Sequence, residues 1–280
     1  MLLGAHVSSA GGHYKAFGYA EAWDCTAMQI FTKAPSNWRA KPISEEDAAK
    51  FREAAQASGV KVTVAHDSYL INLASPNPDI LNKSLAAMRE ELERCEQLGV
   101  PYLVTHMGSH MGEGDDAGLA KLAQSIDHVH DQLPGFKAKI LLESTAGQGT
   151  NLGYRFEHLA YVIGHVKEPE RLGVCLDTCH LFVAGYDIRT APAYRKTMKA
   201  FDQIVGLNRV QCWHLNDAKM ELGSRRDRHE HIGKGEIGKE AFRLILNDRR
   251  FANVPKIIET PDTDTEGLKD LKVLRALVKK

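Results

Sequence analysis

Residues 61–106 read KVTVAHDSYLINLASPNPDILNKSLAAMREELERCEQLGVPYLVTH, and this stretch predicts a strand, a helix and a second strand. Short runs rich in Val, Leu and Thr at 61–65 and 102–105 are typical of buried strands. Between them, apolar residues spaced four and three apart fall on one helical face: Leu81, Leu85, Met88, Leu92 and Cys95. Gly99 and Pro101 then end the helix.

The same alternation continues along the whole chain. Eight strands are predicted, at 2–7, 27–31, 61–65, 102–105, 139–142, 172–176, 209–213 and 256–258. Helices are predicted near 44–58, 78–98, 115–133, 154–166, 191–204, 238–248 and 264–278. This α/β pattern favours a single (β/α)8 TIM barrel with its active site at the C-terminal ends of the strands, and an open doubly wound sheet is the alternative. Because no linker-like tract or repeat divides the chain, we expect one domain over 1–280.

Composition narrows the class of protein. A chain of 280 residues with 43% hydrophobic content can bury a core, which excludes disordered and collagen-like proteins. Basic and acidic residues both number 36, so charge alone does not suggest a nucleic-acid-binding polycation. Without a signal peptide, an apolar run of about 18 residues or a CxxC motif, the chain is expected to be cytoplasmic, with reduced thiols and no membrane contact.

Six successive predicted strands, from the third to the eighth, are each followed by a residue that can bind a metal or move a proton. These residues are His66, His106, Glu143, Asp177, His214 and Glu259. In a barrel the strand ends meet on one face. A single residue of this kind at a strand end commonly has only a structural role. Three carboxylates close together repel one another, however, and bound cations would offset that repulsion. The pattern therefore predicts a metal centre.

Two further clusters extend this centre. His180 follows Asp177 by three residues in an expected loop, and Asp227-Arg228-His229 lies in the long polar stretch 215–237. Asp227 and His229 alternate with Arg228, so both can face one ion in an extended segment. The resulting nine donors are too many for one tetrahedral site and suit two or three ions. Mixed nitrogen and oxygen donors suit Zn²⁺, with Mn²⁺ or Fe²⁺ possible at one site.

Other chemical signals are weaker. Residues 233–238 match G-x-G-x-x-G, but they follow a polar loop, so we expect them to shape that loop rather than bind a nucleotide. Cys179 is expected to pack, and His130 and His158 are expected on helix surfaces. His6 is left open, as a residue that could support the metal ligands.

Several motifs resemble those of the endonuclease IV family, the zinc-dependent apurinic/apyrimidinic (AP) endonucleases. They are HDSYLINL at 66–73, ESTAGQG at 143–149, CLDTCH at 175–180, HLNDAK at 214–219 and LGSRRDRH at 222–229. The similarity extends from GAHVS at 4–8 to Glu259-Thr260, nearly the whole chain. These motifs are long, ordered and independent of one another, so the resemblance is specific.

The resemblance implies a barrel with three Zn²⁺ ions. His66 and His106 would hold the first ion, and Glu143 would bridge it to the second. Asp177, His214 and Glu259 would hold the second ion, and His180, Asp227 and His229 the third. The substrate would be duplex DNA with an abasic site, cut on the 5′ side to leave a 3′-hydroxyl and a 5′-deoxyribose phosphate. Glu143 would be catalytic by orienting the attacking water, and trimming of blocked 3′ ends would be a second activity.

The resemblance also implies how the DNA would be held. Tyr69 and Leu70 would wedge into the base stack. Phosphate contacts are expected from Lys33, Arg39, Arg225, Arg226, Arg228 and Lys234. Ser36 departs from the family, where an Arg often fills the gap left by a flipped nucleotide, and Arg39 could compensate in part. We expect a monomer without an obligate protein partner.

Two other functions fit parts of the pattern. A sugar isomerase or epimerase on the same barrel would use strand-end His, Asp and Glu residues around one or two ions. A non-enzymatic binder of damaged DNA, or a metal-storage protein, would not need the bridging carboxylate Glu143. The third set of donors, with Asp227 and His229, favours the nuclease over both.

Overall fold

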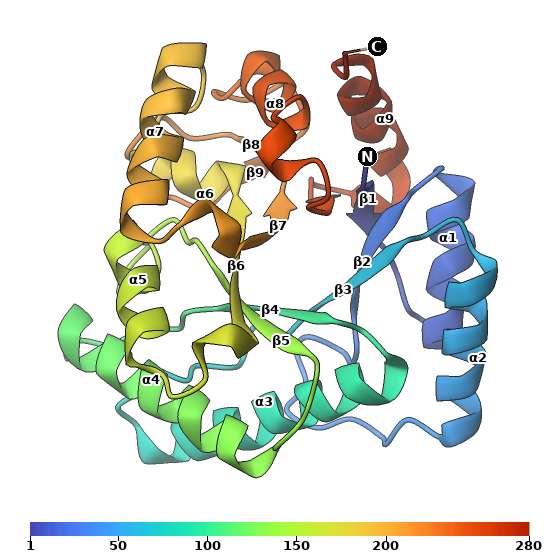
Figure 1. The fold of residues 1–280 in the computed structure, drawn as a ribbon, viewed down its shortest axis with the longest axis vertical. Coiled ribbons are helices and arrows are strands. Elements are labelled where there is room, and N and C mark those ends of the chain that lie inside the picture. Colours follow the sequence, from blue (N-terminus) through green and yellow to red (C-terminus); the bar gives the residue numbers. More distant parts are fainter. Residues whose placement is uncertain (280) are drawn as a thin grey trace.

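Eight parallel strands close into a barrel at the centre of the computed structural model, and helices ring it (Figure 1). The order around the barrel is β1 (Leu3–His6), β10 (Lys256–Ile258), β7 (Val210–His214), β6 (Leu172–Asp177), β5 (Lys139–Glu143), β4 (Tyr102–His106), β3 (Val62–His66) and β2 (Ala27–Phe31). The structure describes residues 1–279, without the side chain of Asp264. The predicted closed barrel is confirmed, and the alternative prediction of an open doubly wound sheet is wrong.

The helices follow the strands along the chain and cover the outside of the barrel (Figure 1). They are α1 (Ala16–Ala22), α2 (Glu45–Ala57), α3 (Pro78–Leu98), α4 (Asp115–Gln132), α5 (Phe156–His165), α6 (Thr178–Val183), α7 (Ala191–Ile204), α8 (Lys239–Leu246) and α9 (Thr263–Ala276). Short 3₁₀ turns span His13–Lys15, Pro169–Arg171, Leu207–Arg209 and Arg249–Phe251. In residues 1–279, no helix combines the length and the apolar character needed to cross a bilayer.

The bounds of α3 follow from its end signals. The side chain of Asn77 accepts hydrogen bonds from the amides of Asp79 and Ile80, which caps the first turn. At the other end Gly99 adopts a φ of 75°, the left-handed conformation that ends helices. The helix therefore matches the predicted range 78–98.

Two apolar layers hold the barrel. The larger lies between the strands and the helices and includes Trp213, Phe242 and Phe251. The smaller fills the barrel interior with Ala27, Val64, Val104, Leu141, Cys175, Cys212 and Ile257. Because side chains alternate along a strand, Cys212 and His214 point inward while Trp213 points to the helices. The interior layer thus lies directly below the polar strand ends.

Five strands, β3 to β7, run one residue further than predicted, so their donor residues end the strands rather than follow them. The ladders account for this, because His106 is registered with Glu143 and Asp177 with His214. The residues of the centre are thus held on the rigid sheet. Only Glu259 lies one residue beyond its strand, β10.

Several local expectations are wrong. Residues 178–180 belong to α6 rather than a loop, because the Asp177 carboxylate accepts the amide of His180 and begins a helix there. The stretch 215–237 contains a hairpin of β8 (Asp217–Ala218) and β9 (His229–Glu230).

Two histidines expected on helix surfaces are buried. His130 is buried because it follows Ile126 by one turn on the inner face of α4. His158 is buried because its Nδ1 accepts the amide of Gly153, which draws the ring inward.

Candidate metal centre

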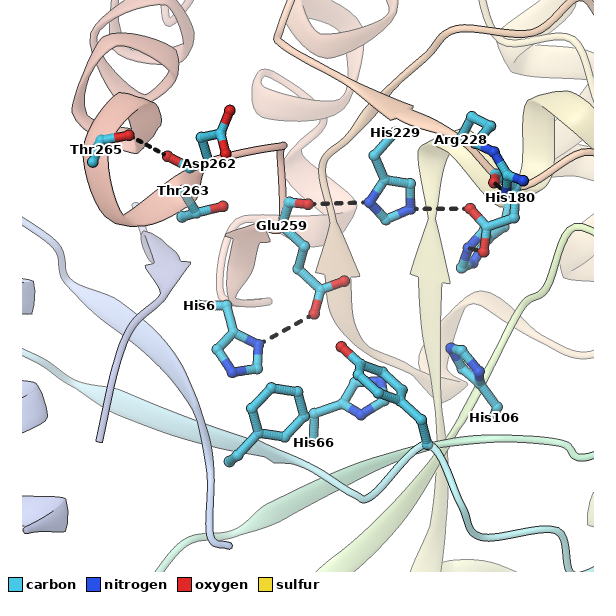
Figure 2. Close-up of a pocket in the computed structure, with 13 residues that line it drawn as sticks. His6, His66, His106, His180, Arg228, His229, Glu259, Asp262, Thr263 and Thr265 are labelled. Atoms are coloured by element: carbon cyan, nitrogen blue, oxygen red, sulfur yellow. Dashed lines mark hydrogen bonds and ion pairs between the residues drawn. The ribbon is translucent and has the colours of Figure 1, made fainter. Parts of the chain in front are cut away.

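A cavity of roughly 790 Å³ opens where the predicted strand ends converge. Figure 2 shows His66, His106, His180, His229 and Glu259 turned toward this one space. Its wall also contains His6, Phe31, Tyr69, Asp227, Arg228, Asp262, Thr263 and Thr265. Asp177 and His214 lie deeper, with no exposed surface. The strand-end residues that the sequence singled out therefore meet in one place.

The nine donors fall into three sets, in each of which the candidate ligand atoms lie within 4.8 Å of one another. The sets are His66, His106 and Glu143; Glu143, Asp177, His214 and Glu259; and His180, Asp227 and His229. This is the grouping expected from the resemblance, with Glu143 in two sets. Two further sets include a buried thiol: Cys175 and Cys212 with His214, and Cys179 with Asp177 and His229.

Glu143 is the common member because its two oxygens face different partners. Oε2 lies 3.3 Å from His66 Nε2 and 3.2 Å from His106 Nε2. Oε1 lies 2.9 Å from His214 Nδ1. With 1% of the residue exposed, this carboxylate faces imidazoles of two donor sets rather than bulk water.

Three of the imidazoles are oriented by backbone carbonyls. The Nδ1–H groups of His66, His180 and His229 donate to the carbonyls of Asp67, Ser144 and Glu259, at 2.9, 2.8 and 3.1 Å. Such a bond fixes the neutral tautomer and leaves the Nε2 lone pair facing the other way. His66 Nε2 then faces Glu143, and His180 Nε2 faces Asp227 at 3.1 Å.

This arrangement fits divalent cations. In the neutral tautomers, nitrogen lone pairs face carboxylate oxygens, so acceptor meets acceptor with no proton between them. His229 Nε2 is the clearest example of a donor atom that lacks a partner. It is buried without a hydrogen bond, 3.5 Å from Asp227 Oδ1 and 3.8 Å from Asp177 Oδ2. A cation among these atoms would satisfy all of them. The nine donors are all imidazoles or carboxylates, and such mixed nitrogen and oxygen sets suit Zn²⁺.

The electrostatics of the cluster favour added positive charge. Burial opposes the charged form of Glu143, but His214 and His106 outweigh it and hold the pKa of this carboxyl well below its usual value. Burial likewise lowers the pKa of His66, but Glu143 and Glu259 outweigh it and raise this pKa to about 9. The carboxylates thus attract positive charge to the imidazoles, and cations can supply that charge as well as protons do.

Two residues that the sequence analysis did not single out hold the ligands in place. The amide of Asn216 donates from Nδ2 to Asp177 Oδ2 at 2.6 Å, and its Oδ1 accepts the amide of Glu259 at 2.8 Å. Gln29 donates to Glu259 and accepts from His214. Asn216 lies inside the motif HLNDAK and could have been found there. Gln29 lies in an apolar strand and gives no sequence signal.

The glycine loop 233–238 folds around Asp217. The carboxylate of Asp217 accepts amide hydrogens from Ala218, Gly233 and Ile237, each at 2.9 Å. A Cβ on Gly235 would lie 2.3 Å from the Ala218 carbonyl, so only glycine fits. The loop thereby supports the hairpin that carries His229, in line with the loop-shaping role predicted for it.

The residues predicted to touch DNA lie in different settings. Tyr69 is 64% exposed at the cavity mouth, with its ring centroid 5.7 Å from that of His66, and Leu70 beside it is half-buried. Arg225 stacks over Tyr154 at 4.1 Å. The remaining exposed cations of the set are Arg39, Arg226, Arg228 and Lys234.

Lys33 is placed differently. Its side chain is buried, and its ammonium lies 3.6 Å from Glu90 and 3.7 Å from Glu91. This placement argues against the predicted phosphate contact, because the chain turns this cation inward to two carboxylates.

Comparisons with known proteins agree with this geometry. Residues 17–277 match the family model described as "Xylose isomerase-like TIM barrel". A protein named Probable endonuclease 4 from Chloroflexus aurantiacus is 53% identical over 278 residues, which cover 99% of this chain and 98% of that protein. The chain belongs to the endonuclease IV family. The crystal structure of endonuclease IV from Thermus thermophilus superposes with a TM-score of 0.87 at 36% identity, over 99% of this chain and 98% of that one.

Proteins outside the endonuclease IV family also have this barrel fold. A D-tagatose 3-epimerase-like protein also superposes with a TM-score of 0.76, covering 99% of this chain and 98% of its own, but at 18% identity. A likeness at that level shows only the shared barrel. The sugar-enzyme alternative is thus supported by the fold alone.

Proposed function

We propose that this protein is a DNA-repair AP endonuclease that cuts duplex DNA on the 5′ side of an abasic site. The observation that carries the proposal is the meeting of nine nitrogen and oxygen donors at one barrel mouth, in a chain that is 53% identical to an endonuclease 4. The products would be a 3′-hydroxyl and a 5′-deoxyribose phosphate. Trimming of blocked 3′ ends is proposed as a second activity of the same site.

The three sets of donors would hold three Zn²⁺ ions, with Mn²⁺ or Fe²⁺ possible at one of them. His66 and His106 would bind the first ion, Asp177, His214 and Glu259 the second, and Glu143 both. His180, Asp227 and His229 would bind the third. Such ions supply Lewis-acid chemistry, because they neutralise phosphate charge and acidify water.

The chain's own residues would position the reacting groups. Glu143, buried among three imidazoles at the end of β5, can orient a water toward the scissile phosphate. His106 has 38% of its side chain exposed, so its side of the cavity is open to a phosphate entering from solvent. Effective hydrolysis needs the water and the phosphorus in line, and a rigid carboxylate on β5 supports that alignment.

Recognition of the lesion would depend on shape. An abasic site presents no base to read, and its nucleotide is the least costly to flip out of the duplex. Tyr69, exposed at the mouth, and Leu70 would enter the base stack there. The exposed cations of the predicted set would bind backbone phosphates, and these are Arg39, Arg225, Arg226, Arg228 and Lys234. We further propose that the chain acts as a monomer and that residues 1–280 form one domain.

The proposal is tested by incision of a duplex that carries one tetrahydrofuran abasic analogue, with and without a strong chelator. Wild-type protein should cut on the 5′ side, and the chelator should abolish cutting. His106→Ala and Glu259→Ala should also abolish it while the fold persists. His165→Ala, at an exposed histidine on α5, is the matched control and should cut normally. Wild-type cutting by both site variants would contradict the proposal.

A further inference from the structure

Gln29 lies fully buried in the wall of the metal centre, and its amide contacts the donors Glu259 and His214 and the neighbouring His6. It is on β2, registered with His6 on β1, and its side chain points inward toward Glu259 and His214. The amide Nε2 lies 2.5 Å from Glu259 Oε1 and 3.0 Å from His6 Nδ1. The amide Oε1 lies 2.8 Å from His214 Nε2.

The chemistry of these partners leaves one consistent assignment of protons. An ionised carboxylate only accepts, so the Gln29 NH₂ group must face Glu259. Its carbonyl oxygen then faces His214, and an amide oxygen only accepts, so His214 must donate from Nε2. In the neutral ring this places the lone pair on Nδ1. That nitrogen points at Glu143 Oε1 and Glu259 Oε2, at 2.9 and 3.1 Å.

His214 is therefore the exception among the oriented imidazoles. His66, His180 and His229 donate from Nδ1 to backbone carbonyls and present Nε2 to the cluster. His214 presents Nδ1 instead, and its outer nitrogen is held by a side chain rather than the backbone. A single substitution can remove that support, whereas a carbonyl cannot be mutated away.

We propose that Gln29 is a positioning residue that selects the metal-binding tautomer of His214 and aims Glu259 at the same ion. One amide thereby positions two of the four residues in the set Glu143, Asp177, His214 and Glu259. The proposal rests on the proposed metal centre, and it names a residue that touches neither the ion nor the DNA. Loss of such an outer partner typically weakens metal binding by about 10–100-fold.

Two substitutions remove the support of the Gln29 amide in different ways. Gln29→Leu keeps much of the volume and removes both hydrogen bonds. Gln29→Glu keeps an acceptor for His214 Nε2 but places a second carboxylate against Glu259, so it should repel that ligand. The matched control is Gln211→Leu, the same change in an amide on β7 whose Oε1 is buried without a partner.

The experiment measures the affinity of one Zn²⁺ per chain by competition with a chromophoric chelator, together with kcat and KM for incision. For both Gln29 variants we expect one ion to bind about 10–100-fold more weakly. At limiting zinc kcat should fall, excess zinc should restore it, and KM for DNA should not change. Excess zinc should also restore the unfolding temperature of both variants to within about 2 °C of the zinc-loaded wild type, which the loss of a merely structural residue would not allow.

The outcomes are distinct. Wild-type zinc affinity in both Gln29 variants would overturn this inference and leave the proposed function standing. The inference would also be overturned if all ions bound more weakly to the same degree, the unfolding temperature fell and excess zinc did not restore kcat. Such a result would mean that the substitution loosens the whole fold. If the wild type binds zinc but does not cut abasic DNA, the proposed function fails while the affinity readout still tests Gln29.

Discussion

At the scale of single residues, the orientation of each imidazole is what turns a ring of polar side chains into a candidate metal centre. The strand-end rule located His66, His106 and His214 from the sequence alone, because parallel strands end on one face of a barrel. It could not assign which nitrogen each ring presents. That depends on partners far away in the sequence, such as Gln29, which lies 185 residues from His214.

Glu143→Gln tests the bridging carboxylate. The amide keeps the size of the side chain but removes the negative charge of the residue that belongs to two donor sets. We therefore expect kcat/KM for incision to fall about 100-fold or more. The loss should be mainly in kcat, since Glu143 is buried away from the DNA-facing surface. Glu157→Gln, an exposed position on α5, is the control. A fall of less than about threefold would show that no bridging charge is needed.

Ser36→Arg tests the departure from the family at the DNA-facing loop. Ser36 is exposed beside Trp38, Arg39 and Lys83, so a longer cation can be accommodated there. We expect the variant to bind abasic duplex about 3–10-fold more tightly at low salt, because it adds a charge and fills the flipped-out gap. Gln56→Arg, at an exposed position on α2, controls for added charge alone. Equal affinity of the Ser36 variant and wild type would reject this role.

His130 predicts a pH dependence of stability outside the metal centre. Burial, aided by Arg171, lowers the pKa of His130 to about 4, and both ring nitrogens lack a hydrogen-bond partner. Its folded-state pKa is below the unfolded value of 6.5, so stability is full above pH 6.5 and is lost as pH falls toward 4. The contribution lost between pH 7 and pH 5 is about 1–2 kcal/mol.

His130→Leu should remove that loss. Denaturant unfolding at pH 7 and at pH 5 gives the free energy of unfolding of variant and wild type, and the metal centre, common to both, cancels in the difference. The variant should gain about 1–2 kcal/mol relative to wild type on going to pH 5. His128→Leu, at an exposed neighbour on the same helix, should show no such gain. A difference that is the same at both pH values would refute the assignment.

At the scale of elements, the sequence predicted long regular pieces well and short ones poorly. The 21 residues of α3 carry their own end signals and match the prediction. The six residues of α6 have no periodicity to detect, and α6 is a helix because Asp177 caps it while facing the metal centre. β8 and β9 have two residues each and form through the Asp217 loop contacts, which no local pattern encodes.

Gly235→Ala tests whether this hairpin carries a metal site of its own. The added Cβ would lie 2.3 Å from the Ala218 carbonyl and 2.6 Å from Asp217 Oδ1, so the hairpin must shift. Because His229 begins β9, we expect the variant to lose one bound ion per chain and about 10–100-fold in incision, with the barrel intact. Elemental analysis and circular dichroism measure both.

Gly164→Ala is the matched control, since nothing lies within 4 Å of a Cβ at that position. On α5 this change should leave metal content unchanged and stabilise the helix by up to about 1 kcal/mol. Unchanged metal content in the Gly235 variant would separate the hairpin from metal binding.

At the scale of the whole molecule, basic and acidic side chains balance, and the proposed metal ions would concentrate positive charge at the barrel mouth. The formal charge of the chain is zero, yet three divalent ions would add six positive charges at the barrel mouth. The sequence predicted this closed barrel because eight alternations leave few topologies. It could not predict that Lys33 turns inward, because the partner carboxylates Glu90 and Glu91 lie on α3, beyond the next strand.

The salt dependence of DNA binding tests this concentration of charge. Affinity of the metal-loaded protein for abasic duplex should fall steeply as salt rises, with a log–log slope near about −0.9 for each phosphate neutralised. Metal-free protein should bind more weakly and with a shallower slope, because it loses the positive charge at the mouth. Fluorescence anisotropy over a salt series measures both slopes. Parallel slopes for the two forms would show that the ions do not contact the DNA backbone.

A trinuclear centre that cuts abasic DNA is tested most sharply by incision of a tetrahydrofuran-containing duplex as zinc is added back to metal-free protein, with bound ions counted by elemental analysis. Cutting on the 5′ side of the lesion should rise to its maximum as the count approaches three ions per chain. Full cutting at one or two ions per chain, or none at three, would contradict this expectation.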